Sequence, residues 1–355
     1  MFNFFESKIV FSHRHLKIFV ATSIAIFVMV AMQLIGIRAP KLELPIPSKP
    51  DVFFDTIQPK LNLIPNKYNL KKYSSFIAQA GASGNVDNAS AYGVIDYDSG
   101  EIISSKNLSD SFPIASLTKV MTAIVALDLA HPAESFVVSK NASQIIPTKI
   151  GLQVGESMTL NELLHASLLT SANDAVEVIR EGIDSKYDDS IFIRAMNEKA
   201  FVLGLNQTSF SNPQGFDAPK NYSSIEDFAV ITHYALENYP LIKEIVKKDY
   251  ELLSENDFHK RYDLYNWNGL IGVYPNITGV KIGNTDDAGR TTAVVSERNG
   301  KKLIAIILDA PGIIERDLWT AQILDLAYEE RIGLASVGVT EEQLRAKYQT
   351  WKYWN

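Results

Sequence analysis

A serine and a lysine three positions apart are the pair in this sequence best suited to nucleophilic catalysis. Ser116 and Lys119 stand at the start of an apolar pattern with helical spacing. Residues three apart in a helix lie on one face, so the amine can reach the hydroxyl. A free lysine has a pKa of about 10.4, but burial and nearby positive charge lower it and supply a neutral amine that acts as a base. An ordinary helix start explains this pair equally well.

A second candidate element is Ser171-Ala172-Asn173. It stands between the helical patterns of residues 160–169 and 174–181, where a loop can direct a hydroxyl and an amide into one cleft. Serine and asparagine are also preferred residues at helix N-caps. Taken alone, this element therefore favours an N-cap.

A third candidate element runs from Gly279 to Thr285 and carries Lys281. Its pattern is that of a strand, and a strand at a sheet edge can pair with an extended peptide while the lysine supplies positive potential. Lys149-Ile150-Gly151 repeats the Lys-x-Gly pattern. No strand pattern surrounds that second copy, so we do not assign it to the site.

The composition argues against several other kinds of site. The 355 residues include no cysteine, which excludes disulfides, thiolate metal sites and a cysteine nucleophile. The six histidines have no metal-ligand spacing, so we expect no metal and no cofactor. Residues 1–38 carry a net charge of +3 and the remainder −10. A body this acidic, without a basic stripe, is not expected to bind nucleic acid.

The elements that must position these residues belong to an α/β fold. Strand patterns in residues 91–105 and 279–308 enclose a mostly helical stretch between about 120 and 250. Asn299-Gly300 lies between two of the late strands and predicts a hairpin. This order suggests one antiparallel sheet built from N- and C-terminal strands, with a helical subdomain inserted. A helix over about residues 315–331 closes the body.

A run of 20 uncharged residues, 18–37, has the length that a helix needs to cross a bilayer core. A cleavable signal peptide usually has a shorter apolar region and an A-x-A-like site, so we favour an uncleaved anchor. Basic residues flank the run equally on both sides, which leaves its orientation open. Four prolines between residues 40 and 50 then predict an extended spacer.

The last residues predict a short helix. Thr340 and Gln343 have the spacing of a capping box, and Leu344, Tyr348 and Trp351 fall on one face of the helix that follows. We expect this face to pack onto the body; attachment to a membrane interface is the alternative.

Taken in order, the three candidate elements resemble the Ser-x-x-Lys, Ser-x-Asn and Lys-Thr/Ser-Gly motifs of the active-serine penicillin-recognising enzymes. Within that superfamily, residues 113–122, 212–215 and 222–229 resemble the D-alanyl-D-alanine carboxypeptidases, the low-molecular-mass penicillin-binding proteins of peptidase family S11. The likeness covers roughly residues 85 to 330. It implies a β-lactamase/transpeptidase-like fold, preceded here by one transmembrane helix.

The resemblance also implies a role for each residue. Ser116 would attack the carbonyl of a terminal D-Ala-D-Ala peptide and Lys119 would take its proton, giving an acyl-enzyme that water then hydrolyses. Ser171 and Asn173 would relay protons and hold the substrate backbone. Lys281 would help to place the peptide and its negative charge. The implied partners are peptidoglycan stem peptides, and β-lactam antibiotics as covalent inhibitors.

The third motif departs from the family. Ile282, Gly283 and Thr285 are the other substrate-binding candidates, and the family has Thr or Ser where this chain has Ile282. In the family that hydroxyl helps to bind the terminal carboxylate, and losing one such hydrogen bond costs about 10- to 150-fold. We therefore expect a weaker grip on a free C-terminal carboxylate and a shift toward D,D-endopeptidase cleavage of cross-links.

Two other functions remain alternatives. A serine β-lactamase shares the fold, but the Glu-x-x-Leu-Asn sequence with which class A enzymes deacylate does not follow Ser171. A catalytically weak wall-binding scaffold would keep the fold without the chemistry. Ile282 favours the scaffold, whereas the intact Ser116 and Lys119 argue against it.

The resemblance and the patterns together divide the chain into five segments. Peptidoglycan lies outside the cytoplasmic membrane, so residues 1–17 would be cytoplasmic and residues 18–37 the single transmembrane anchor. Residues 38–84 would form a Pro-containing extracytoplasmic linker. Residues 85–333 would be the catalytic domain, on the periplasmic or wall-facing side, and residues 334–355 a short helical tail.

Overall fold

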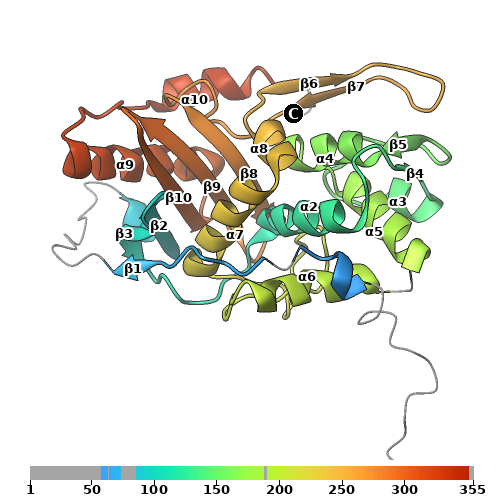
Figure 1. The fold of residues 1–355 in the computed structure, drawn as a ribbon. Coiled ribbons are helices and arrows are strands. Elements are labelled where there is room, and N and C mark those ends of the chain that lie inside the picture. Colours follow the sequence, from blue (N-terminus) through green and yellow to red (C-terminus); the bar gives the residue numbers. More distant parts are fainter. Residues whose placement is uncertain (1–56, 63, 73–84, 188–189, 352–355) are drawn as a thin grey trace, which may run out of the picture. The chain divides into compact units, whose positions relative to one another are not determined.

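A six-stranded sheet forms the centre of this computed structural model, which describes residues 57–62, 64–72, 85–187 and 190–351 (Figure 1). The strands are β1 (Lys71–Lys72), β2 (Ala91–Asp96), β3 (Glu101–Lys106), β8 (Ile277–Thr285), β9 (Gly289–Arg298) and β10 (Lys301–Ala310). Their order is β1-β3-β2-β10-β9-β8, and all neighbours are antiparallel except β1 and β3. The predicted sheet of N- and C-terminal strands is confirmed. Strand β8, which carries the third motif, lies at its edge.

Helices cover both faces of this sheet. The inserted subdomain holds α2 (Thr118–Leu129), α3 (Lys140–Gln144), α4 (Leu160–Leu169), α5 (Asn173–Tyr187), α6 (Ile191–Val202), α7 (Ile225–Asn238) and α8 (Pro240–Val246). Helix α7 contacts β2 and β10 on one face, and α9 (Ile313–Ile332) contacts β9 and β10 on the other. Two small ribbons complete the body, β4 (Ser135–Val137) with β5 (Ser157–Thr159) and β6 (Tyr250–Leu253) with β7 (Tyr262–Tyr265).

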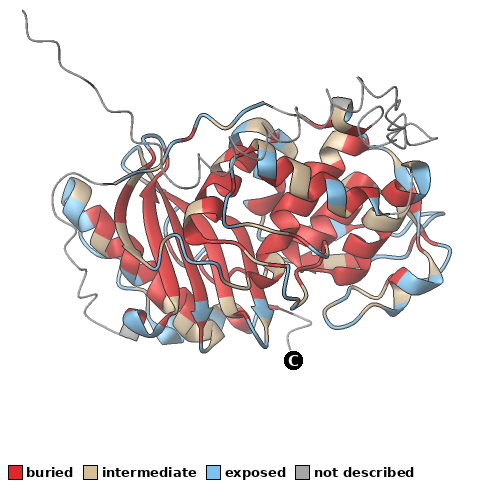
Figure 2. Cartoon of the chain, turned by 90° about the horizontal axis from the view of Figure 1, so that it is seen from below, coloured by how far each residue is buried: buried red, intermediate tan, exposed pale blue. Residues whose placement is uncertain are grey.

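The sequence pattern explains why the layers form in this way. On β9, Ala293 and Val295 pack into the core shared with the inserted helices, while Val294 packs into the core beneath α9. This alternation is the two-residue period of a strand that is buried on both faces. The turn after β9 has φ of 49° at Asn299 and 76° at Gly300, the positive values that a tight hairpin requires. Figure 2 shows the buried strands and the buried faces of the flanking helices.

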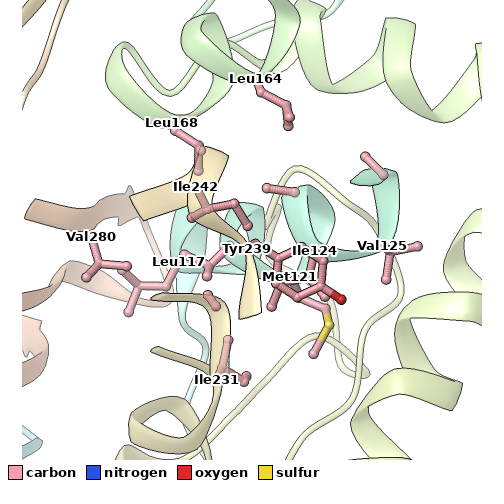
Figure 3. Close-up of a cluster of buried hydrophobic side chains, with 14 of the residues drawn as sticks. Leu117, Met121, Ile124, Val125, Leu164, Leu168, Ile231, Tyr239, Ile242 and Val280 are labelled. Atoms are coloured by element: carbon pink, nitrogen blue, oxygen red, sulfur yellow. The ribbon is translucent and has the colours of Figure 1, made fainter. Parts of the chain in front are cut away.

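Helix α2 is the centre of the inserted subdomain. It is apolar on almost every face, as expected for a helix surrounded by other helices, and it contacts α4, α5, α6 and α7. Figure 3 shows Leu117, Met121 and Ile124 within this core, with Ile231 from α7 and Val280 from β8 close by. The residues just after Ser116 are therefore held in the main hydrophobic core.

Part of the predicted linker is packed on the body, so the prediction of a free spacer over residues 38–84 was too long. Ile57 and Leu61 are buried in the main core, and Tyr68 stacks on His233 with ring centroids 3.9 Å apart. Lys71 and Lys72 then pair with β3. The sequence pattern did not predict this packing. Single apolar residues in an extended segment can be buried without a regular hydrophobic period.

The C-terminal helix packs onto the body, as predicted. Helix α10 (Glu341–Tyr348) has the capping box, in which Thr340 and Gln343 bond each other's backbone N–H groups. Leu344, Tyr348 and Trp351 are buried in the core that also holds α9.

The predicted membrane anchor over residues 18–37 lies outside the described residues and stays a prediction. Among the residues that the structure describes, no helix is long and apolar enough to cross a membrane.

Candidate active site

Two glycines allow the chain to close around Ser116. The serine lies in a single 3-10 turn, Ala115–Leu117, that leads into α2. A Cβ atom on Gly215 would lie 2.0 Å from the carbonyl oxygen of Ala115, and one on Gly283 would lie 2.9 Å from the backbone nitrogen of Ser116. The loop of Gly215 and the edge strand β8 therefore contact this turn at distances that no other residue type permits.

Lys119 is placed to act as a base toward Ser116. Its Nζ lies 2.8 Å from Ser116 Oγ and donates to the carbonyl of Gln214 at 2.6 Å. The side chain is fully buried. Burial, followed by the positive charge of Lys281, lowers the pKa of Lys119 well below its ordinary value. The predicted contact between these residues is confirmed, and the amine is neutral at a pH where a free lysine is charged.

Lys281 is a second buried amine close by. It lies opposite Ala293 on β9, so its side chain is on the face of the sheet toward the inserted helices. Its Nζ donates to the carbonyl of Ile282 at 2.9 Å. Burial and the charge of Arg316 lower the pKa of Lys281 to about 7. Its charge therefore changes within the neutral pH range.

Ser116 opens into a cavity of about 730 Å³, a size typical of ligand sites. The cavity is lined by Ser116, Thr148, Lys149, Ile150, Thr170, Ser171, Lys260, Arg261, Tyr262, Asp263, Trp267, Ile282, Gly283 and Asn284. Four of the predicted site residues are among them. They come from the 3-10 turn before α2, the loop between α4 and α5, and β8. Segments far apart in the sequence thus meet at one cavity.

The other predicted site residues lie next to the cavity lining. Asn173 is buried at the start of α5, where its Nδ2 donates to the carbonyl of Pro147 at 2.6 Å and its backbone N–H donates to Thr148. It thereby holds the 147–150 loop beside Ser171. Thr285 lies at the end of β8, where its hydroxyl donates to Asp217 at 2.6 Å.

Several residues of the cavity were not predicted from the sequence. The set-aside Lys149-Ile150-Gly151 segment contributes Lys149 and Ile150 as a loop, not as a strand. The hairpin of β6 and β7 contributes Lys260 through Asp263. Its strands are short and half exposed, so they carry no clear apolar period. In the described part of the chain, no cluster of three or more histidine or acidic side chains is placed to hold a metal ion.

Comparison with known proteins decides the family. Residues 78–312 match the sequence profile of the peptidase S11 family, described as D-alanyl-D-alanine carboxypeptidase. The chain belongs to this family. It is 31% identical to D-alanyl-D-alanine carboxypeptidase DacF of Bacillus subtilis over 67% of this chain and 61% of that protein. With DacA of Haemophilus influenzae it shares 28% identity over 68% and 62%. The chain thus spans about three fifths of the length of these two relatives.

Solved structures of similar proteins identify the fold of this chain. The Streptomyces K15 DD-transpeptidase matches with a TM-score of 0.63 and 24% identity, over 68% of this chain and 97% of that one. At this identity the likeness shows the fold alone. The α/β transpeptidase-like fold predicted from the sequence is confirmed.

Ile282 remains the departure of this S11 family member from its motif. The residue lies directly opposite Thr292 on β9, so both side chains are on the same face of the sheet. Thr292 Oγ1 is buried and has no hydrogen-bond partner among the described residues. The site therefore has an apolar side chain where the family has a hydroxyl, beside a hydroxyl that is not used.

Proposed function

We propose that this protein is a serine-type D-Ala-D-Ala carboxypeptidase that trims the terminal D-alanine from peptidoglycan stem peptides through an acyl-enzyme on Ser116. The arrangement around Ser116 carries the proposal. The buried Lys119 amine lies 2.8 Å from Ser116 Oγ, its pKa is lowered by burial and by Lys281, and the serine opens into a cavity bordered by a sheet edge.

In acylation, Lys119 Nζ takes the proton of Ser116 Oγ as the oxygen attacks the carbonyl carbon between the two D-alanines. The carbonyl oxygen becomes an oxyanion, and backbone N–H groups stabilise it. The N–H of Ser116 is one donor, and β8 supplies the other beside it, where Gly283 and Asn284 line the cavity. The proton on Lys119 then passes to the nitrogen of the departing D-alanine, with the Ser171 hydroxyl as relay.

Deacylation repeats these transfers with water. Lys119, neutral again, takes a proton from a water molecule as its oxygen attacks the ester carbon, and the proton returns to Ser116 Oγ. The products are the shortened peptide and the free enzyme. Lys281 in its charged form contributes positive potential for the carboxylate of the terminal D-alanine.

The peptide is held as an added strand. Strand β8 is the last strand of the sheet, so its outer backbone groups can pair with an extended peptide. Ile282 preserves this pairing because isoleucine suits a strand. It removes the hydroxyl that would hold a free C-terminus, so D,D-endopeptidase cleavage of cross-links is the second candidate activity.

We further propose that the protein works outside the cytoplasmic membrane, held there by the helix predicted over residues 18–37. The support is the uncharged run itself and the location of peptidoglycan. A β-lactam ring presents a strained amide to Ser116 in the place of the peptide, so these antibiotics are expected to acylate the enzyme.

Labelled penicillin followed by mass spectrometry tests the proposed function. We expect one stable adduct per chain, on Ser116, and none on a Ser116→Ala variant. Release of D-alanine from a D-Ala-D-Ala pentapeptide should be lost in the same variant. Rapid turnover of penicillin would instead indicate a β-lactamase, and the absence of any adduct would favour the scaffold.

A further inference from the structure

Two lysines from different loops line the Ser116 cavity and have no part in the proposed acyl transfer. Lys149 lies in the 147–151 loop, and Lys260 lies just before β7 in its hairpin with β6. We propose that Lys149 and Lys260 form an anion subsite, which binds a side-chain carboxylate of the peptide upstream of the two D-alanines. This subsite rests on the proposed function and narrows its substrate class to acidic stem peptides.

The lining of the cavity is positively charged although the body is acidic. Residues 39–355 carry a net charge of −10. The charged residues of the lining are three cations and one carboxylate: Lys149, Lys260, Arg261 and Asp263. Arg261 is neutralised within the lining, because its Nε and Nη2 donate to the two carboxylate oxygens of Asp263 at 3.0 and 2.9 Å. The two lysines therefore carry the unmatched charge.

Each of the two amines is bonded to an uncharged group. Lys149 Nζ donates to the carbonyl of Ser143 at 3.2 Å, and Lys260 Nζ donates to the carbonyl of Gly151 at 2.9 Å. No carboxylate in the described part of the chain forms an ion pair with either amine. An ammonium group has three donors, and both side chains are exposed. Each lysine therefore keeps donors that a ligand in the cavity can reach.

Glu156 contacts Lys260 through its backbone and not through its amine. The Glu156 carboxylate accepts from the backbone N–H groups of Gln153 and Lys260 at 2.7 and 3.1 Å, and from the Tyr262 hydroxyl at 2.5 Å. Glu156 is not part of the cavity lining. Together with the bond from Lys260 Nζ to Gly151, these contacts fix the hairpin to the loop that carries Lys149. The two lysines are therefore held on one wall of the cavity.

The cavity is large enough to hold more of the peptide than its last two residues. Its volume of about 730 Å³ is that of a site for a drug-sized ligand. Strand β8 also lines this cavity, so a peptide that is paired with β8 passes the wall of the two lysines. The terminal carboxylate belongs beside Lys281 and Ile282 in the proposed function, and the D-alanine side chains are uncharged. A second carboxylate must therefore come from a residue before the D-alanines.

Two pairs of pentapeptides that end in D-Ala-D-Ala test this subsite. Within each pair glutamate is replaced by glutamine, either at the residue before the two D-alanines or one residue earlier. We expect the kcat/KM of D-alanine release to be about 3- to 30-fold higher for the glutamate peptide of one pair, the range for charged hydrogen bonds at exposed positions. The preference should shrink in 1 M salt, because the screening length falls from about 10 Å at 0.1 M to about 3 Å. Equal kcat/KM values within both pairs would overturn the inference.

Lys149→Met and Lys260→Met remove the charges and keep most of the side-chain length. In the double variant the ratio of kcat/KM for glutamate and glutamine peptides should fall to about 1. Lys149→Met alone leaves the bond from Lys260 to Gly151 in place and should lower the ratio in part. Lys243→Met is the matched control, since Lys243 is exposed on α8 and does not line the cavity. If the lysine variants keep the ratio of the parent, as this control should, the inference is wrong.

The terminal carboxylate is the other anion that could bind these lysines, and a third pair of peptides distinguishes it. Both peptides carry glutamine upstream, and one ends in a carboxylate whereas the other ends in a carboxamide. We expect Lys149→Met and Lys260→Met to leave the ratio of kcat/KM within this pair unchanged. A ratio that falls here, and not in the glutamate pairs, would assign the lysines to the terminal carboxylate and overturn the inference.

Binding to an inactive variant separates this inference from the proposed function. Ser116→Ala cannot form an acyl-enzyme, so isothermal titration calorimetry with the same peptides measures affinity alone. Tighter binding of a glutamate peptide, lost when Lys149→Met and Lys260→Met are added, supports the subsite even if the parent releases no D-alanine. Equal affinities for the glutamate and glutamine peptides overturn it even if the parent releases D-alanine from both.

Discussion

Ile282 is the residue most expected to set the balance between the two candidate activities. Its side chain lies opposite Thr292 on β9, whose hydroxyl has no hydrogen-bond partner among the described residues. A peptide whose C-terminus is free needs a donor near this point, whereas a cross-linked peptide with its carboxylate elsewhere does not. We therefore expect an apolar residue here to disfavour a free C-terminus selectively.

Ile282→Thr is expected to raise the kcat/KM of D-alanine release by about 10- to 150-fold, because one hydrogen bond to the substrate carboxylate is restored. Thr292 opposite gives the new hydroxyl a partner when no substrate is bound. The measurement is D-alanine release from a pentapeptide. Ile282→Val is the control, since valine has the shape of threonine without its hydroxyl. Equal kcat/KM values of the two variants would show that the missing hydroxyl at position 282 does not limit D-alanine release.

The chemistry of single residues was partly predictable from the sequence. The spacing of Ser116 and Lys119 predicted their contact, because a helix brings residues three apart together. It did not predict that Gln214, 95 residues away, holds the amine. The sequence motifs also assigned Asn173 and Thr285 to the site, whereas in the structure both side chains are hydrogen-bonded to neighbouring loops. Side-chain partners supplied by distant loops leave no local signal.

The contact between the 212–215 loop and the serine turn is expected to be intolerant of a single methyl group. Gly215→Ala places a Cβ 2.0 Å from the carbonyl oxygen of Ala115 and forces a residue with a side chain to φ of +89°. We expect a loss of about 2 to 5 kcal/mol in the free energy of unfolding, from the strained backbone and the overlap together. Acylation should slow as well, because the loop carries the carbonyl that holds Lys119.

The variant Gly204→Ala is a control that separates backbone strain from steric overlap of the new Cβ. Gly204 also has a positive φ, +73°, but a Cβ there meets nothing within 4 Å. Gly204→Ala should therefore cost only about 1 to 2 kcal/mol and leave acylation unchanged. Chemical denaturation of both variants measures the difference, and equal losses would contradict the role of the contact.

Helices and strands were predictable where their apolar residues recur with a clear period. The pattern over residues 160–169 matches α4, and the late strand patterns match β8, β9 and β10 to within a few residues. The hairpin of β6 and β7 was missed because its side chains are mostly half exposed and include charged residues. The 147–151 loop was missed because it is held by Asp174 and Asn173, not by a regular element.

The protein as a whole is expected to remain with the membrane. The full chain should sediment with membranes and be released by detergent but not by high salt, since residues 18–37 would bury an apolar helix in the bilayer. A variant without residues 1–37 should be soluble and still react with penicillin. Fractionation followed by N-terminal sequencing makes the measurement. A soluble exported chain that begins beyond residue 37 would instead identify the segment as a signal peptide.

The overall architecture followed from the order of patterns along the chain, with strands at both ends and helices between. The boundary between the predicted linker and the body could not be predicted in this way. Ile57, Leu61 and Tyr68 are buried as isolated apolar residues without a regular spacing. The tail was predicted correctly, since its capping box and apolar face are local features. Its hydrogen bond to Asp317 depends on tertiary structure that no local pattern records.

The central sheet also has a consequence for how the protein folds. Ile95 on β2 pairs with Ile304 on β10, so the first hairpin lacks its partner strand until almost the whole body has been synthesised. At about 5 to 20 residues per second, that delay is roughly 10 to 40 seconds. Such a high contact order slows folding. During that interval the edge of β2 that later pairs with β10 is exposed, and we expect this apolar edge to favour aggregation of the nascent chain.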